Sequence, residues 1–185
     1  MQVVYLMRHG QDDESYVGGW SDVSLIPEGE QQVIKSAEWI RDNLNIKMIY
    51  CSDVNRAMET AKIVSKIIGV NYEDTHILRE QNKGILNGML RTEADKVLPG
   101  YKKRDVDYRY PEGESLKMLY GRVKKVLDTF EFEDDVLFIT HRGVINMIYY
   151  ISNDIELDMN KKRFGVEPAS IHEYDYRNKK IRRIK

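Results

Sequence analysis

The stretch VLFITHRG at residues 136–143 joins five apolar or β-branched residues to a histidine, an arginine and a glycine. So short and apolar a run predicts a strand that is buried on both faces, because a strand with one face in water would alternate apolar and polar residues. Residues 2–10, QVVYLMRHG, have the same form. Since ligands bind outside the carboxyl ends of parallel strands in open α/β sheets, two such strand ends predict one shared polar site.

Four segments beyond these strands show helical periodicity. In the first, Val33, Ala37, Ile40 and Leu44 fall at i, i+4, i+7 and i+11, which is one apolar stripe, and Pro27 suits the first turn. The second is expected to start at Ser52 or Asp53 as its cap and to end at Gly69. The third is predicted from about 114 to 130, and the fourth from 144.

Further strands are expected at 47–51, near 72–77 and in the tail from 169, whereas 81–112 has no single clear period. Strands that alternate with helices of about 15 residues predict an α/β fold with a mostly parallel central sheet and helices on both faces. No linker or repeat divides the chain, and about 150 residues per domain makes 1–185 a single domain.

Composition excludes several classes of protein. The chain has 185 residues, with 29 Lys plus Arg and 30 Asp plus Glu, so its net charge of −1 argues against a protein that coats nucleic acid or anionic lipid. The single cysteine, Cys51, excludes an intramolecular disulfide. No apolar run approaches the roughly 20 residues of a membrane span, and the N-terminal residues lack the features of a signal peptide. We therefore expect a cytoplasmic protein.

Charged and imidazole side chains gather at the predicted strand ends. Arg8 and His9 follow the first strand, and His141 follows the strand at 136–140. Arg56 stands in the first turn of the helix after Cys51, where backbone N–H groups and the helix dipole already favour an anion. A guanidinium there adds bidentate recognition of phosphate oxygens. The four side chains together predict an oxyanion site.

Several motifs in the same order resemble those of the histidine phosphatase superfamily, which contains cofactor-dependent phosphoglycerate mutases and many small phosphatases. The resemblance spans about residues 3–150 and implies a three-layer α/β/α sandwich like that of the mutases. The motifs are Arg8-His9-Gly10, SDVNRAMETA at 52–61, Leu78-Arg79-Glu80 with Gly84 and Gly88, PEGES at 111–115, and Thr140-His141.

The resemblance also implies a role for each site residue. His9 would be the nucleophile that forms a phosphohistidine, and Arg8, Arg56 and His141 would clamp the phosphoryl oxygens. Glu80 would protonate the leaving alkoxide and then take a proton from the water that hydrolyses the intermediate. The covering segment, about 81–112, would determine substrate specificity.

The chain departs from the family pattern at two places. Family members commonly have Asn at the position of Ser15, which here follows Asp12, Asp13 and Glu14. Either these acids point to solvent and Ser15 donates to the phosphate, or the loop is rebuilt with different phosphate contacts. Arg142 stands where Gly is usual, and it either adds a cation to the pocket or turns outward.

No cofactor or metal is expected. The histidines and the cysteine show no metal-binding spacing, and two arginines can supply the positive charge that a metal ion would otherwise provide. The expected partner is a small phosphomonoester, with a homodimer possible. The basic tail at 179–185 is interpreted as the exposed face of an edge strand and not as a nucleic-acid site.

Three functions remain open. A metal-independent phosphatase is favoured, because only 30 residues separate Glu80 from Pro111 and so short a cover should let water reach His9. The alternatives are a mutase-type phosphotransferase and a non-catalytic phosphate-binding module. A cysteine phosphatase is excluded, since Cys51 and Arg56 are one residue too close for Cys-x5-Arg. Tyr101 to Arg104, with Tyr108 to Tyr110, either grip a second anionic group or form a solvated face.

Overall fold

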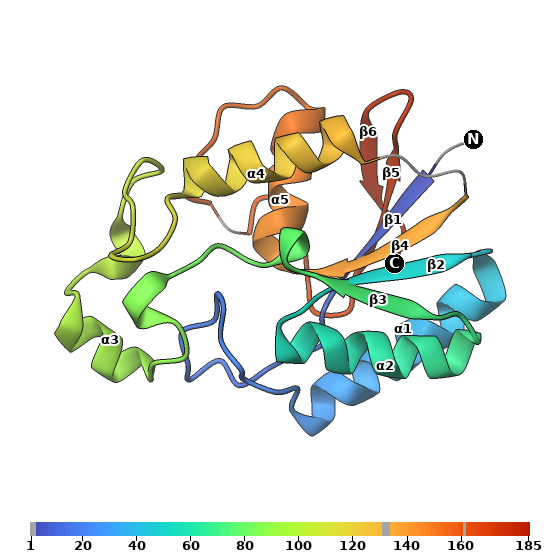
Figure 1. Cartoon of the computed structure of the whole chain (residues 1–185), viewed down its shortest axis with the longest axis horizontal. Coiled ribbons are helices and arrows are strands. Elements are labelled where there is room, and N and C mark those ends of the chain that lie inside the picture. Colours follow the sequence, from blue (N-terminus) through green and yellow to red (C-terminus); the bar gives the residue numbers. More distant parts are fainter. Residues whose placement is uncertain (1–2, 131–133, 161) are drawn as a thin grey trace.

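A computed structural model describes residues 3–130, 134–160 and 162–185. The chain forms a six-stranded sheet (Figure 1). The strand order is β3-β2-β4-β1-β5-β6, with parallel pairing from β3 to β1 and antiparallel pairing of β5 with β1 and with β6. The expected mostly parallel sheet is confirmed, and the basic tail forms the edge strand β6 as predicted. The strands are β1 Val3–Arg8, β2 Met48–Ser52, β3 Tyr72–Thr75, β4 Val136–Thr140, β5 Ile171–Asp175 and β6 Lys180–Arg183.

Helices cover both faces of this sheet. Val3, Tyr5 and Met7 of β1 pack in the core shared with α1 and α2, whereas Val4 and Leu6 pack in the core shared with α4 and α5. The two-sided burial predicted for this strand is therefore confirmed for its described residues, and the fold is an α/β sandwich. The helices are α1 Pro27–Asn43, α2 Asn55–Ile68, α3 Arg91–Val97, α4 Leu116–Thr129 and α5 Arg142–Ser152, with short 3-10 turns at η1 His76–Leu78, η2 Gly84–Leu86 and η3 Tyr101–Lys103.

The predicted N-terminal cap of α2 is wrong. Gly69 ends α2 in the left-handed conformation as expected (φ 73°), but the N-cap is Val54, which makes no side-chain cap bond. Both predicted capping side chains are used elsewhere. Asp53 binds the Arg79 guanidinium with both carboxylate oxygens, and Ser52 contacts His141 at 2.9 Å.

The covering segment lies beside the sheet and has its own small apolar cluster (Figure 1). It contains η2, α3 and η3, none longer than seven residues, which explains why no helical period is visible in the sequence. Gly84 closes the segment on the turn before α4: its φ is 57°, and a Cβ there would lie 1.7 Å from the Pro111 carbonyl oxygen. The cluster consists of Val17, Leu86, Ala94, Tyr101 and Tyr110.

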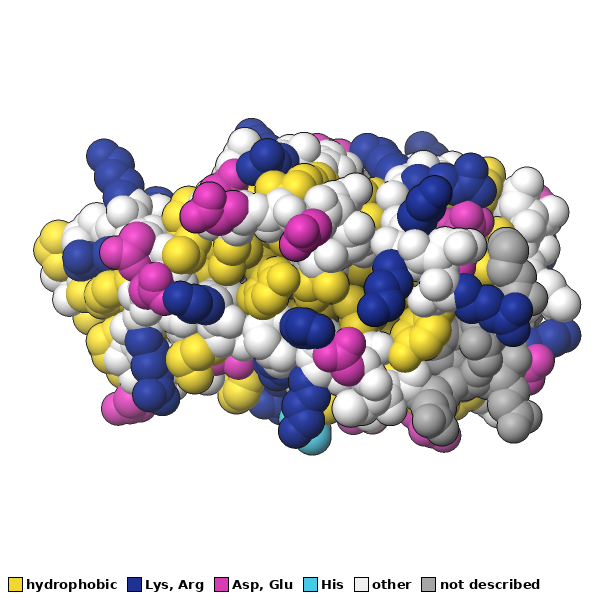
Figure 2. All heavy atoms as spheres, turned by 90° about the horizontal axis from the view of Figure 1, so that it is seen from above, with side chains coloured by type: hydrophobic (Ala, Val, Ile, Leu, Met, Phe, Trp, Pro, Cys, Tyr) yellow, Lys and Arg dark blue, Asp and Glu magenta, His cyan; other side chains and the backbone are white. Residues whose placement is uncertain are grey.

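Both signs of charge occur on the face seen from above. Basic side chains are more numerous there than acidic ones, and hydrophobic side chains lie between them (Figure 2). Within the described residues, no helix combines the length and apolarity that crossing a bilayer requires.

Candidate active site

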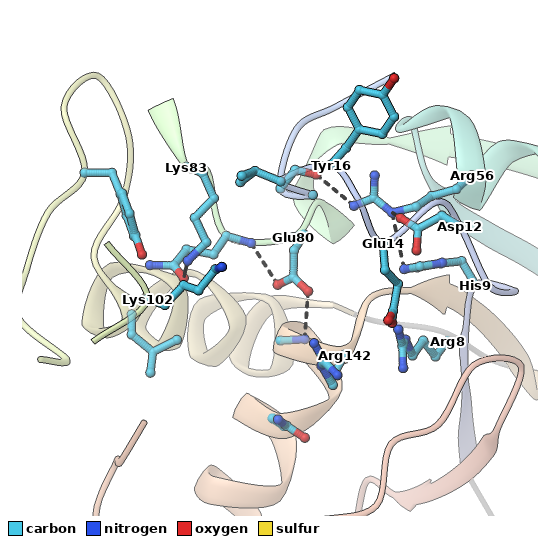
Figure 3. A pocket seen from close by; sticks show the side chains of 18 of the residues that line it. Arg8, His9, Asp12, Glu14, Tyr16, Arg56, Glu80, Lys83, Lys102 and Arg142 are labelled. Carbon is cyan, nitrogen blue, oxygen red and sulfur yellow. Dashed lines mark hydrogen bonds and ion pairs between the residues drawn. The ribbon is translucent and has the colours of Figure 1, made fainter. Parts of the chain in front are cut away.

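The carboxyl ends of the central strands bring the predicted side chains together. Arg8 of β1 is the register partner of Thr140 of β4, so the residues that follow them, His9 and His141, stand next to each other with ring centroids 5.1 Å apart. Arg56 reaches the same point from the first turn of α2 (Figure 3). The strand-end convergence inferred from the sequence is therefore confirmed.

His9 is held in one tautomer. Its Nδ1 lies 2.7 Å from the Gly10 carbonyl oxygen, which can only accept, so Nδ1 carries the proton and Nε2 keeps a lone pair. Burial, and then the positive charges of Arg56 and Arg8, hold the pKa of His9 well below its usual value. His9 is 5% exposed and is a neutral imidazole at neutral pH. A neutral, oriented imidazole is what a nucleophile requires.

The Arg56 guanidinium is fixed by the loop opposite it. One terminal nitrogen donates to the Ser21 hydroxyl and carbonyl at 3.1 and 3.3 Å, and the other donates to the Gly19 carbonyl at 2.8 Å. Thr60, one turn along α2, accepts from the Gly10 N–H at 3.2 Å and donates to the Arg56 carbonyl at 2.7 Å. Thr60 thereby connects the loop after His9 to the helix that carries Arg56. Sequence analysis missed it, although it stands within the 52–61 motif.

His141 lies between Arg56 and Ser52. Arg56 can only donate, so the 3.2 Å contact makes Nδ1 of His141 an acceptor, and Nε2 is left to donate to the Ser52 hydroxyl at 2.9 Å. Burial, Arg56 and His9 lower the pKa of His141 well below its usual value. The ring is fully buried and is not among the residues that line the pocket. In this arrangement both ring nitrogens of His141 have partners within the protein, and the Nδ1 contact helps to orient Arg56.

Of the two remaining cations, Arg8 and Arg142, Arg8 is the better placed to bind an anion. One of its terminal nitrogens donates to the Val166 carbonyl at 3.0 Å, while its buried Nε has no hydrogen-bond partner among the described residues. Burial, followed by repulsion from Arg142, lowers the pKa of Arg8 to about 10, so it stays charged at neutral pH. A buried charged group with a free donor is costly unless an anion joins it, which fits a phosphate site.

Glu80 faces this cluster as a carboxylate. Burial raises its pKa, but hydrogen bonds from the Gln81 and Gly143 N–H groups, both 2.9 Å, and the charges of Arg56 and Arg142 outweigh burial, so the pKa is lowered overall. Gly143 permits this contact, since a Cβ there would lie 1.9 Å from a Glu80 carboxylate oxygen. The sequence shows a glycine after Arg142, but it does not show that this glycine makes room for the Glu80 carboxylate.

The loop at 12–15 shows parts of both alternatives, since Asp13 and Glu14 are exposed whereas Asp12 is not. Asp12 turns inward and its carboxylate lies 3.4 Å from Nε of Arg56. Ser15 does not line the pocket and its side chain bonds the exposed Asp13 carboxylate, so it is not placed as a phosphate donor. The reason is the turn at 13–16, in which the Ser15 N–H also bonds Asp13 at 2.9 Å. Arg142 does line the pocket, which agrees with its interpretation as an added cation.

The pocket extends outward from His9 and Glu80 and has a cavity volume of about 150 Å³. A cavity that holds one water needs roughly 10–15 Å³, so this pocket has space both for a phosphoryl group and for the rest of a small ester. Of the aromatic and basic residues singled out in the cover, Tyr101, Lys102 and Tyr110 line it, and Lys102 is labelled in Figure 3. Further lining residues that the sequence did not point to include Lys83, Asn146, Tyr150 and Asp158. No cluster of three or more His, Cys, Asp or Glu suited to a metal occurs in the part of the chain that the structure describes.

The fold and the site define an α/β protein whose pocket, at the carboxyl ends of the central strands, is lined by a histidine and several arginines. A model of the histidine phosphatase superfamily (branch 1) matches residues 4–184, and the chain belongs to this family. Curated relatives include human 6-phosphofructo-2-kinase/fructose-2,6-bisphosphatase 4, 31% identical in an alignment of 163 residues that covers 83% of this chain and 34% of that protein. Phosphoglycerate mutase-like protein 4 of Arabidopsis thaliana is 33% identical in an alignment of 159 residues that covers 79% of this chain and 69% of that protein. The chain thus spans about a third of the length of the bifunctional relative.

Solved structures share the fold over nearly the whole chain. A mycobacterial glucosyl-3-phosphoglycerate phosphatase superposes with a TM-score of 0.76 at 22% identity, covering 99% of this chain and 97% of the other. The protein TTHB049 from Thermus thermophilus gives a TM-score of 0.73 at 26% identity, covering 100% and 99%. These likenesses establish the architecture inferred from the sequence.

Proposed function

We propose that this protein is a phosphatase that hydrolyses small phosphomonoesters through a phosphohistidine on His9, without a metal ion. One observation carries the proposal: His9 is a buried, neutral imidazole whose Nδ1 proton is held by the Gly10 carbonyl, so that Nε2 presents its lone pair beside Arg56. A module that only binds phosphate needs neither an oriented imidazole nor a carboxyl group opposite it.

The first half-reaction joins Nε2 of His9 to phosphorus and breaks the bond from phosphorus to the ester oxygen. Arg8, Arg56 and Arg142 offset the charge on the transferring phosphoryl oxygens, and positioned charges of this kind carry most of the catalysis in phosphoryl transfer. Glu80, a carboxylate in the free enzyme, accepts the proton that the substrate monoanion brings and passes it to the leaving oxygen. His141 keeps the Arg56 guanidinium in place through its 3.2 Å contact.

The second half-reaction returns the site to its starting state. Glu80, now a carboxylate again, takes a proton from a water molecule, whose oxygen attacks phosphorus and breaks the bond to Nε2 of His9. The same group serves both half-reactions, as microscopic reversibility requires. The proton then leaves Glu80 with the phosphate, which restores the carboxylate, and the products are inorganic phosphate and an alcohol.

The relatives support hydrolysis in general and leave the substrate open. Two of them carry a phosphatase activity in their names, a bisphosphatase and a glucosyl-3-phosphoglycerate phosphatase, while the Arabidopsis relative is named mutase-like. Exposed residues such as Asp13 and Glu14 line the outer side of the pocket, which favours access of water over retention of the phosphoryl group. The mutase-type reaction is therefore the second candidate.

The first test is release of inorganic phosphate from p-nitrophenyl phosphate and from a panel of phosphorylated metabolites, with EDTA present throughout. We expect turnover that EDTA does not reduce. If the folded protein releases no phosphate from any compound, hydrolysis is the wrong reaction. Exchange of phosphate between two added metabolites, with no free phosphate, would identify the mutase-type transferase instead.

The dependence of kcat/KM on pH follows from the two shifted pKa values. His9 has a lowered pKa, so it stays neutral and nucleophilic as the pH falls below 6.5. Glu80 also has a lowered pKa and is ionised in the free enzyme, so the proton for the leaving group must enter with the substrate monoanion. Phosphomonoesters lose that proton with a pKa of about 6. We therefore expect kcat/KM to be level below about pH 6 and to fall about tenfold per pH unit well above it.

Measuring the profile with two esters whose phosphate pKa values differ checks this assignment. The falling limb should move with the pKa of the ester. A limb that rises with pH and is centred near 6.5 would instead show that His9 titrates as an ordinary histidine, which contradicts the proposed protonation states.

A further inference from the structure

Every N–H donor of Arg56 faces a partner within the protein. The four terminal N–H groups bond Ser21 twice, Gly19 and His141, as described above. The fifth donor, at Nε, points to Nε2 of His9 at 3.3 Å. A guanidinium has only these five donors. A phosphoryl group that binds Arg56 must therefore take over a donor that the structure shows in use.

Asp12 shares that fifth donor. Its carboxylate oxygen lies 3.4 Å from the same Nε that faces the nucleophilic nitrogen of His9 (Figure 3). The side chain is 15% exposed and the Arg56 side chain 2% exposed, so water screens the pair little. The backbone of Asp12 is fixed by a bridge to Leu25, which places the carboxylate on the pocket wall. A negatively charged oxygen thus stands beside the point where a phosphoryl oxygen must come.

The other contacts of Arg56 hold it without Asp12. Its terminal nitrogens are bonded to Ser21, Gly19 and His141 at 3.3 Å or less, whereas the contact with Asp12 is a single pair at 3.4 Å. Asp12 thus makes the longest of the contacts of Arg56 and is the only carboxylate paired with it among the described residues. An incoming phosphate can replace this contact with one of the same charge, because both place an anionic oxygen on the same donor.

We propose that Asp12 is an internal competitor for phosphate: its carboxylate pairs with Arg56 at the phosphoryl position and is displaced when the phosphoryl group of the substrate, or the product phosphate, binds. The proposal rests on the proposed function, because it places phosphate at His9 and Arg56. It makes Asp12 a residue that weakens affinity for phosphate and so favours product release, in a site whose buried cations would otherwise retain an anion.

The test compares binding of inorganic phosphate, by isothermal titration calorimetry, to the wild type and to Asp12→Asn. Asparagine keeps the shape and can still accept from Arg56, but it carries no charge to repel phosphate. We expect the Kd for phosphate to fall by about tenfold, and product inhibition of turnover to strengthen in parallel. Asp12→Thr is a second variant, and it should bind phosphate more tightly than the wild type too.

Asp22→Asn is the matched control, because it removes the same charge from an exposed residue of the same loop that does not line the pocket. Its Kd should stay within about twofold of the wild type. The proposal is overturned if both Asp12 variants, shown to be folded by their thermal melts, bind phosphate no more tightly than the wild type, or if Asp22→Asn gains as much. Failure of the proposed function has a different signature, since the wild type would then release no phosphate from any ester, whether or not it binds inorganic phosphate.

Discussion

Replacing His9 with alanine is expected to lower kcat for phosphomonoester hydrolysis by at least about 10⁴-fold. The side chain supplies the attacking Nε2, and no other imidazole can take its place: His141 is engaged through both ring nitrogens, and His172 is buried between Tyr149 and Ser170. Steady-state release of p-nitrophenol measures the loss. Rapid quenching of the wild type with labelled substrate should trap a phosphoenzyme that is labile to acid and stable to alkali, and the variant should trap none.

The matched control is His76→Ala, which removes an exposed imidazole from η1, outside the pocket lining. It should turn over like the wild type. A His9→Ala protein that is folded and keeps more than about a hundredth of the wild-type kcat would contradict nucleophilic catalysis by this residue. Water activated by Glu80 alone would then be the better account of the reaction.

The sequence predicts the fold and the centre of the site for a definite reason. The runs before His9 and His141 are apolar enough to be buried on both faces, and parallel pairing of β1 with β4 then brings the residues after them together whatever lies between. The helix stripes are predicted correctly for the same reason, because burial against one face of a sheet imposes a period. The predicted strand ends and the predicted start of a helix were therefore enough to place His9, Arg8 and Arg56 in the site.

What the sequence could not give are contacts that depend on side-chain direction. Asp12 stands among three consecutive acids, and only the loop backbone decides that it turns in toward Arg56 while Asp13 turns out. His141 was expected to bind phosphate, yet Ser52 and Arg56 occupy both of its nitrogens. Periodicity carries no information about such choices.

The structure of the covering segment could not be predicted for a related reason. Its elements are three to seven residues long, too short to show a period, and they are held by turns at Gly84 and Gly100 and by the cluster around Leu86 and Tyr101. Tertiary packing and not local pattern specifies such a segment. Lys83, which lines the pocket from this segment, was accordingly not singled out.

Replacing Glu80 with glutamine is expected to have the second largest effect, and one that depends on the leaving group. For an alkyl phosphate, whose alkoxide must be protonated, kcat should fall by about 10²–10⁴-fold. For p-nitrophenyl phosphate the leaving phenolate needs little help, so formation of the phosphohistidine should be nearly normal while its hydrolysis, which needs Glu80 as base, is slow. Glutamine can still accept a hydrogen bond from Gly143 or Gln81 but cannot transfer the proton.

Pre-steady-state mixing separates these two effects. The variant should release p-nitrophenol in a burst equal to the enzyme concentration, followed by a slow steady rate, and the trapped phosphoenzyme should accumulate, whereas Glu38→Gln on the exposed side of α1 should behave as the wild type. Equal losses for alkyl and aryl esters without a burst would mean that Glu80 acts only by holding Gly143 and Arg142 in place. A burst, in contrast, shows that Glu80 is needed as the base of the second half-reaction, and a larger loss for alkyl than for aryl esters shows that the same carboxyl group is the acid of the first.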